Sequence, residues 1–170
     1  MAVLTKPEIL KQIDSGRIKI EPFNPDFVGP ASIDFHLAHT FRIFKQIKGS
    51  FIVDEQPNYH QVTELIRAKD SLTLQPGESA HGITVESLEL PDDLCGWIQG
   101  RSTLARIGLM VHVTANFIHP GTHGQQVLEM TNAGPMPLTI MVGIPICQII
   151  LEETKGSAQY TGRFFKQKTP

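Results

Sequence analysis

The chain has 170 residues, of which 41% are hydrophobic and 19% charged, so it can bury the core of one ordinary domain and wholesale disorder is excluded. Its 15 Lys and Arg residues against 17 Asp and Glu residues give a net charge of -2. This balance argues against binding to nucleic acid or to an anionic membrane through bulk charge. No run reaches the roughly 18 consecutive apolar residues of a membrane span, and the first ten residues lack the pattern of a signal peptide.

One short helix is expected first, between Thr5 and Gly16. Thr5 can cap its N-terminus, and Pro7 suits its first turn. Gly16 ends the helix, because glycine readily adopts the left-handed conformation that follows a helix. The apolar residues of this segment recur at helical spacing, namely Ile9, Leu10 and Ile13.

Short runs rich in Val, Ile, Thr and Phe make up the rest of the chain, separated by turns that contain Pro, Gly, Asn or Asp. Many short strands at this spacing, together with 14 Gly and 12 Pro residues, predict a mainly β fold, either a distorted jelly roll or a β-barrel. The expected strands cover residues 32–44, 71–74, 79–90, 95–99, 109–118, 125–132, 138–142 and 146–153.

Cys95 and Cys147 are the two cysteines, and each lies in an apolar run that is typical of a strand. Two buried thiols in a reducing compartment are expected, with a disulfide as the alternative. We therefore expect a cytoplasmic protein.

The end of the chain differs in composition from the rest. No internal repeat or low-complexity linker divides residues 1–170, so we expect a single domain. Residues 155–170 are polar and basic, and they form either a frayed end or a flap that orders on a ligand. Aromatic and cationic residues alternate between Tyr160 and Lys168, a pattern that can stack on a base and neutralise phosphates, although charged tails are more often solvated.

Residues 100–106, with the sequence GRSTLAR, are the segment richest in groups that recognise phosphate. Gly100 lets the backbone approach a ligand, two hydroxyls donate hydrogen bonds, and Arg101 and Arg106 offer forked cationic donors. The segment is not a Walker loop, and it is equally compatible with a polar turn that opens a short helix.

Glu129 is the second candidate for chemistry. Strand alternation places it on one face with Val127 and Thr131, while Leu128 and Met130 lie on the other. A carboxylate between apolar neighbours tends to have a raised pKa, which suits a general base near neutral pH. A glutamate on a solvated strand face is the alternative.

The histidines do not predict a zinc site. His36 and His39 are close in sequence, as are His119 and His123, with His112 nearby. The spacings used by zinc-dependent deaminases and proteases are absent, and Pro and Gly between His119 and His123 keep them off one helical face.

Taken together, these segments resemble the deoxycytidine triphosphate (dCTP) deaminase family, within the trimeric dUTPase-like superfamily. The most specific part is residues 100–115, GRSTLARIGLMVHVTA, which is close to the family's phosphate and catalytic motif. The remaining matching segments follow in the family's order along almost the whole chain: residues 20–23, 29–34, 74–78, 90–94, 127–129 and 143–148.

The resemblance implies a fold of the dUTPase-like type, assembled as a homotrimer with sites at subunit interfaces. It implies hydrolytic deamination of dCTP to dUTP and ammonia, in the supply of uracil nucleotides for thymidylate synthesis. No zinc is expected, and Mg²⁺ would be bound with the nucleotide through its phosphates. Inhibition by dTTP is common in the family and is expected here on that ground.

Roles follow for individual residues from the same resemblance. Glu129 matches the general base, which deprotonates a water that attacks C4 of cytosine. Ser102 and Arg106 match the residues that hold and polarise that water, and the backbone of Ala115 matches the group that reads the cytosine amino group. The other residues implied to bind substrate are Arg101, Thr103, Leu104, Ala105, His119, Val127, Leu128 and Gln148, together with Tyr160, Arg163 and Gln167 of a tail that closes over the nucleotide.

His119 is the main departure from the family pattern, because the family typically has an aspartate in the matching Ile-Asp-Pro-Gly segment. In true dUTPases that aspartate organises the attacking water, so its absence weakens the dUTPase reading more than the deaminase reading. Residues 111–115 resemble those of members that only deaminate, which favours dUTP as the product. The alternatives are a bifunctional deaminase and dUTP diphosphatase, a dUTPase, and a non-catalytic nucleotide-binding homologue.

Overall fold

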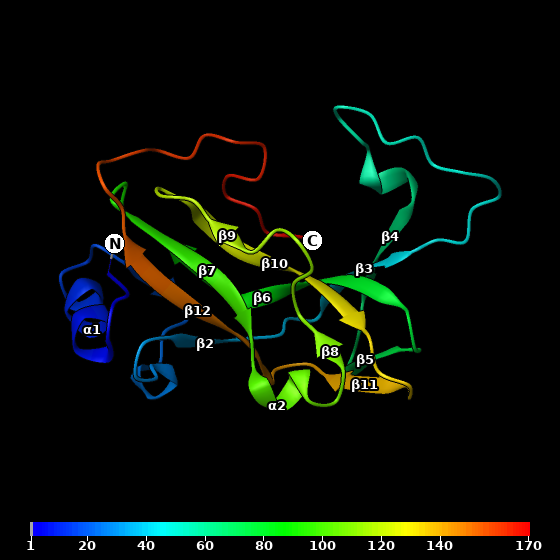
Figure 1. Cartoon of the computed structure of the whole chain (residues 1–170), viewed down its shortest axis with the longest axis horizontal. Helices are drawn as coiled ribbons and strands as arrows, with labels where there is room; N and C mark the ends of the chain where they lie inside the picture. Colours follow the sequence, from blue (N-terminus) through cyan, green and yellow to red (C-terminus); the bar gives the residue numbers. More distant parts are fainter. Residues whose placement is uncertain (1) are drawn as a thin grey trace.

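The structure is a computed structural model that describes residues 2–170, and its strands form three antiparallel sheets (Figure 1). The largest sheet has the order β4-β3-β6-β10-β8, with β1 also paired to β6, the second has the order β2-β12-β7-β9, and the third is the pair β11-β5. The strands are β1 (Lys19–Glu21), β2 (Ile33–His36), β3 (Thr40–Phe44), β4 (Thr63–Arg67), β5 (Ser71–Leu74), β6 (Ser79–Glu89), β7 (Leu94–Gly100), β8 (Leu109–Met110), β9 (Phe117–Ile118), β10 (His123–Asn132), β11 (Leu138–Met141) and β12 (Pro145–Glu153).

This mainly β, jelly-roll-like architecture confirms the predicted fold class, although the sheets are not closed into a barrel. The helices are α1 (Lys6–Asp14) and the single turn α2 (Ser102–Ala105), with 3-10 turns η1 (Pro25–Phe27) and η2 (Tyr59–Gln61). Within residues 2–170, none of these helices has the length and apolar character needed to cross a membrane.

The core lies between the sheets and follows the alternation of the long strands. In β10 every second residue is buried, so Leu128 and Met130 are fully buried while Glu129 on the opposite face is only partly so, as predicted. Both cysteines are buried and free, which confirms two thiols and excludes a disulfide between them.

Helix α1 forms where it was predicted, and Ile9 on its inner face is fully buried. Gly16 follows the helix with φ of 74°, the conformation for which glycine is suited. Thr5 is at the N-cap, but its side chain makes no capping hydrogen bond, so that part of the prediction is wrong. Instead, Glu8 in the first turn pairs with Lys11 and accepts a hydrogen bond from Gln12.

Residues 109–118 do not form the single strand that their apolar composition predicts. Only β8 and β9 at the two ends pair with neighbours, and residues 111–116 between them form a loop. Three backbone N–H groups of this loop donate to the carboxylate of Glu129, so they take no part in a strand ladder. β1 and β4 were not anticipated either.

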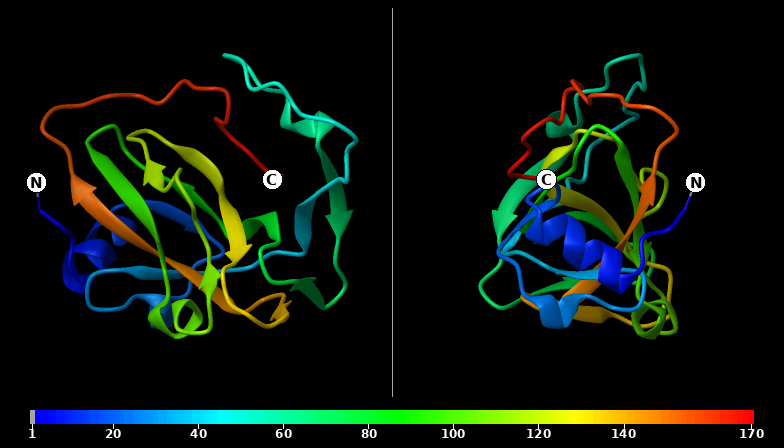
Figure 2. Two further views of the ribbon diagram at one scale, coloured as in Figure 1. Left: turned by 45° about the vertical axis from the view of Figure 1, so that its right-hand side comes forward. Right: turned by 90° about the vertical axis from the view of Figure 1, so that its left-hand side faces the viewer.

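Residues 155–170 run from the end of β12 across β7, β9 and β10 (Figures 1 and 2). The backbone of the tail is hydrogen-bonded to the elements below it: Tyr160 N–H donates to the carbonyl of Pro120 in the turn before β10 at 2.9 Å, and Gln125 N–H of β10 donates to the Gln167 carbonyl at 3.1 Å. The tail therefore covers one end of the molecule.

Candidate functional site

A cavity of about 410 Å³ lies between the tail and the large sheet. Strands β6 and β10 supply part of its wall, the segment from residue 115 to residue 123 supplies another, and the tail covers it. Its lining comprises Tyr59, His81, Ile98, Ala115, Phe117, Ile118, His119, Thr122, His123, Gln125, Gln126, Val127, Glu129, Tyr160, Phe164, Gln167 and Pro170.

Glu129 projects from β10 toward the 111–116 loop, and the loop holds one oxygen of its carboxylate. Oε2 accepts hydrogen bonds from the backbone N–H groups of Val113 at 3.0 Å, Thr114 at 2.9 Å and Ala115 at 3.3 Å. Three donors on one oxygen fix the orientation of the side chain, so its position is set by the backbone and not by other flexible side chains.

The pKa of Glu129 is lowered, contrary to the prediction of a raised value. Burial is the largest single influence and raises the pKa, but the three backbone N–H donors and the nearby His81 together outweigh it. The sequence shows the apolar neighbours of Glu129 but not the loop that folds onto it. The carboxylate is therefore ionised at neutral pH and available to accept a proton.

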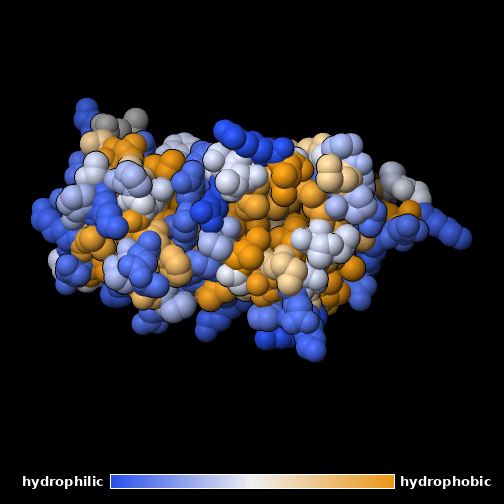
Figure 3. All heavy atoms as spheres, turned by 90° about the horizontal axis from the view of Figure 1, so that it is seen from below, coloured by the Kyte–Doolittle hydropathy of each residue, from blue (hydrophilic) through white to orange (hydrophobic). Residues whose placement is uncertain are grey.

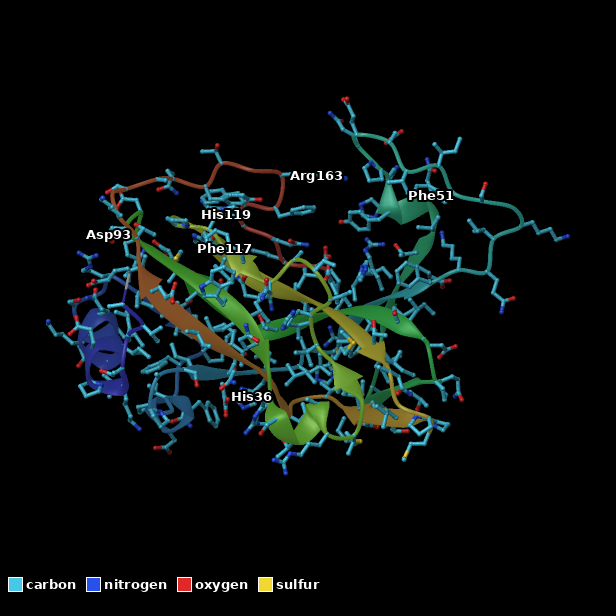
Figure 4. The ribbon with its side chains drawn as sticks, in the orientation of Figure 1. His36, Phe51, Asp93, Phe117, His119 and Arg163 are labelled. Carbon is cyan, nitrogen blue, oxygen red and sulfur yellow. The ribbon has the colours of Figure 1, made fainter. Side chains whose placement is uncertain are left out.

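His119 belongs to a series of aromatic rings that connects the sheet to the tail (Figure 4). Its ring is stacked on Tyr160 of the tail, with centroids 5.2 Å apart and planes at 6°. Phe117 contacts His119 edge-on at 4.8 Å and packs against Trp97 of β7 at 4.9 Å. His119 thus holds the tail against the cavity wall by an aromatic contact that an aspartate could not make.

Arg163 lies at the outer edge of the covered region, with its guanidinium 5.7 Å from the ring centroid of Tyr59 in η2 (Figure 4). Together with His60 and Lys168 it borders a second, smaller depression of about 240 Å³ next to the main cavity. This edge is cationic and suits an anionic group of a ligand.

The predicted phosphate segment lies elsewhere. In Figure 1 the turn α2 is at the lower edge of the molecule and the tail is at the upper edge. Ser102, Thr103, Ala105 and Arg106 are exposed, and none of residues 101–106 lines the cavity. The alternative of a polar turn opening a short helix is what residues 102–105 form.

Two side chains near α2 are held by neighbouring strands. Arg101 contacts Asp34 at 3.3 Å and donates to the carbonyl of Pro145 at 3.2 Å. Gln148 donates to the carbonyl of Gly100 at 3.4 Å and accepts from Ser32 at 3.0 Å. These contacts fix the base of the turn and leave its exposed hydroxyls and Arg106 directed away from the core.

One chain therefore brings together only part of the predicted site. The cavity contains Ala115, His119, Val127, Glu129, Tyr160 and Gln167. Leu128 faces the core on the other side of β10, and Arg163 borders the second depression.

Several residues of the lining were not predicted from the sequence, among them His81, Tyr59 and Phe117. His81 lies directly opposite Glu129 in the β6–β10 register. That relationship depends on the pairing of strands more than 40 residues apart, and no local pattern in the sequence shows it. Within residues 2–170, no three His, Cys, Asp or Glu side chains gather in a way that could hold a metal ion.

Comparison with protein families shows a match of residues 3–154 to the model described as dCTP deaminase-like. A protein of Mycobacterium sp. (strain KMS) named "dCTP deaminase, dUMP-forming" is 36% identical over 177 residues, covering 99% of this chain and 93% of its own length. A protein of Nocardioides sp. with the same name is 34% identical, covering 99% of this chain and 92% of its own.

Solved structures agree on the fold. The crystal structure of 2'-deoxycytidine 5'-triphosphate deaminase from Agrobacterium tumefaciens has a TM-score of 0.66 at 21% identity, over 88% of this chain and 47% of that longer one. An aspartate-to-asparagine mutant of the dUTPase from phage phi11 of S. aureus has a TM-score of 0.53 at 13% identity, over 88% of this chain and 99% of that one.

Proposed function

Because the chain belongs to the dCTP deaminase-like family, we propose that it hydrolyses the amino group of dCTP without zinc, releasing ammonia and dUTP. The observation that carries this proposal is the ionised carboxylate of Glu129, fixed by three backbone N–H donors at the wall of a covered cavity. A cavity of about 410 Å³ is large enough for a nucleoside.

In the proposed reaction Glu129 takes a proton from a water molecule as the water oxygen bonds to C4 of cytosine. Glu129 passes that proton to N3, takes the second proton of the former water from the oxygen now on C4 and delivers it to the amino group, so that the C4–N bond breaks, ammonia leaves and a C4 carbonyl remains. A positioned base of this kind contributes about 10²–10⁴-fold in rate. The covering tail would exclude bulk water and strengthen every electrostatic contact with the reacting atoms.

The other half of the site would come from a second copy of the chain. Ser102 and Arg106 are exposed on α2 and lie outside the cavity of their own chain, so we propose that they enter a neighbour's cavity in a homotrimer. The exposed apolar side chains of this end support an interface there, and Figure 3 shows apolar surface gathered on the side of α2, β8 and β11. They include Ile107, Met110, Met136 and Met141.

We propose that Mg²⁺ arrives with the triphosphate, that Arg101 of a neighbouring copy and the cationic tail neutralise phosphates, and that Thr103 of the neighbouring copy donates a hydrogen bond to them. dTTP, as a triphosphate of similar shape, would compete for the same groups. Two free, buried thiols support a reducing, cytoplasmic location.

A second candidate is the further conversion of dUTP to dUMP by the same chain. It is favoured by the relatives at 34–36% identity, which are named dUMP-forming. His119 at the position where the family pattern has aspartate favours release of dUTP instead.

The experiment is an incubation of the protein with dCTP and Mg²⁺, in which nucleotides are separated while ammonia and pyrophosphate are assayed. Ammonia with accumulating dUTP supports the first candidate, and ammonia with dUMP and pyrophosphate supports the second. Bound dCTP with no ammonia would overturn both and indicate a non-catalytic nucleotide-binding protein.

A further inference from the structure

Three polar side chains form a row across the large sheet beneath the tail. In the antiparallel register His81 of β6 is paired with Glu129 of β10 on one side and with Arg42 of β3 on the other. Directly paired residues of antiparallel strands project from the same face, with Cβ atoms about 4.5–5.5 Å apart. An imidazole therefore lies between the carboxylate of the proposed base and a guanidinium.

Two aromatic rings also contact the imidazole, which otherwise lines the cavity. Phe44 contacts it edge-on with ring centroids 5.4 Å apart, and Tyr59 of η2 does so at 6.4 Å. The Arg42 guanidinium lies 5.4 Å from the Tyr59 ring centroid and is itself buried. The titratable or charged groups that face His81 are thus Glu129, Arg42 and Tyr59, and Arg42 also donates a hydrogen bond to the backbone oxygen of Pro170, which lines the same cavity.

This environment keeps His81 neutral at neutral pH. Burial lowers its pKa most, Glu129 opposes that effect, and Arg42 lowers the pKa further. A proton added to His81 at acid pH would place a positive charge next to Glu129. That charge would stabilise the carboxylate and weaken it as a proton acceptor.

We propose that His81 is a positioning residue for the deamination proposed above, whose protonation weakens Glu129 as a base and so sets the acid limit of activity. His81 makes and breaks no bond in the reaction; it acts only through Glu129. The proposal rests on the proposed function.

The first test compares the rate of ammonia release from dCTP as a function of pH for the parent, His81→Gln and His39→Gln. The glutamine keeps a neutral polar side chain of similar length, and His39 is an exposed histidine outside the cavity. We expect the acid limb of kcat to move to lower pH by about one unit in His81→Gln, with KM close to that of the parent. We expect no movement in His39→Gln. Coinciding acid limbs for His81→Gln and the parent would overturn the proposal.

The second test needs no turnover and does not depend on the folding of a His81 variant. The ring of His81 is titrated by NMR in the parent and in Glu129→Gln, which keeps a hydrogen-bond acceptor but removes the charge. Loss of that charge should lower the His81 pKa by roughly half a unit. An unchanged titration would overturn the proposal. A parent that releases no ammonia overturns the deamination instead, and the titration still decides whether the two side chains are coupled.

Discussion

The cavity beneath the tail and the turn α2 hold the two parts of the proposed site, and they differ in how complete they are within one chain. Glu129 at the cavity is held by three backbone donors, covered by the tail and paired with His81. Ser102 and Arg106 on α2 are exposed, and no residue of that turn reaches the cavity.

This difference is the reason why the proposed site needs a second copy of the chain. In the proposed site, Glu129 is already fixed by the loop but lacks a partner that polarises water, and the exposed hydroxyl of Ser102 and guanidinium of Arg106 would supply that chemistry from another chain. In a closed ring of head-to-tail contacts, each chain would supply its α2 to the cavity of the next chain, so that every copy has a complete site.

The largest effect is expected from Glu129→Gln. The substitution removes the carboxylate charge but keeps an acceptor for the loop N–H groups, so the cavity should remain intact. We expect ammonia release from dCTP to fall by about 10²–10⁴-fold, while dCTP binding measured by calorimetry is retained. Deamination at the parent rate would mean that the base lies elsewhere.

Mixing two inactive variants tests whether the two regions meet between chains. Glu129→Gln and Arg106→Ala should each be inactive alone, but co-refolded in equal amounts they should recover roughly a quarter of the parent's sites, because each intact site needs one half from each chain. As a control, Glu129→Gln is mixed with the double variant Glu129→Gln/Arg106→Ala. This mixture contains no intact Glu129 and should recover no activity. No recovery in the first mixture would place both halves in one chain.

The tail contact is expected to have a smaller effect. Tyr160→Ala removes the ring stacked on His119, a contact worth about 0.5–1.5 kcal/mol, so KM for dCTP should rise roughly 2–10-fold. Tyr160→Phe keeps the ring and should behave like the parent. Hydrogen exchange of residues 160–168 should accelerate only in the alanine variant, and equal exchange in both would exclude the stack as the cause.

The smallest effect concerns stability against pH. Because the folded pKa of Glu129 lies below its ordinary value of 4.5, the unfolded chain binds a proton more readily. The stabilisation from Glu129 is present above pH 4.5 and is lost as pH falls through the lower folded value. Urea unfolding below pH 4.5 should therefore show a loss that is absent from Glu129→Gln, of less than about 1 kcal/mol at this partly exposed position. An identical decline in both proteins would contradict the lowered pKa.

Much of the fold could be predicted because it follows from local patterns. The helical spacing of Ile9 and its apolar neighbours predicts α1, and the alternation around Glu129 predicts which face of β10 is buried. The strand β4 could not be found in this way, because Thr63–Arg67 is a mostly exposed edge strand with no buried alternation.

The candidate site was less accessible to prediction for a physical reason. The pKa of Glu129 depends on the loop that contains Thr114, and the neighbour of Glu129 is set by pairing with His81 on a distant strand. Both depend on contacts between segments that are far apart in the sequence and meet only in the folded chain. The family resemblance predicts Glu129 as the base, while the electrostatic surroundings of Glu129 are visible only in the folded chain.

The three loop N–H groups make the two oxygens of Glu129 inequivalent. Within residues 2–170 every hydrogen bond to this carboxylate reaches Oε2, and Oε1 receives none. In the proposed reaction Oε1, which the loop leaves free, would accept each proton and hand it on, with no rotation of the side chain between the two events. Both proton transfers would then take place at Oε1. The nucleotide would have to move slightly relative to this fixed oxygen between them, and the direction of that movement would set the order of the two transfers.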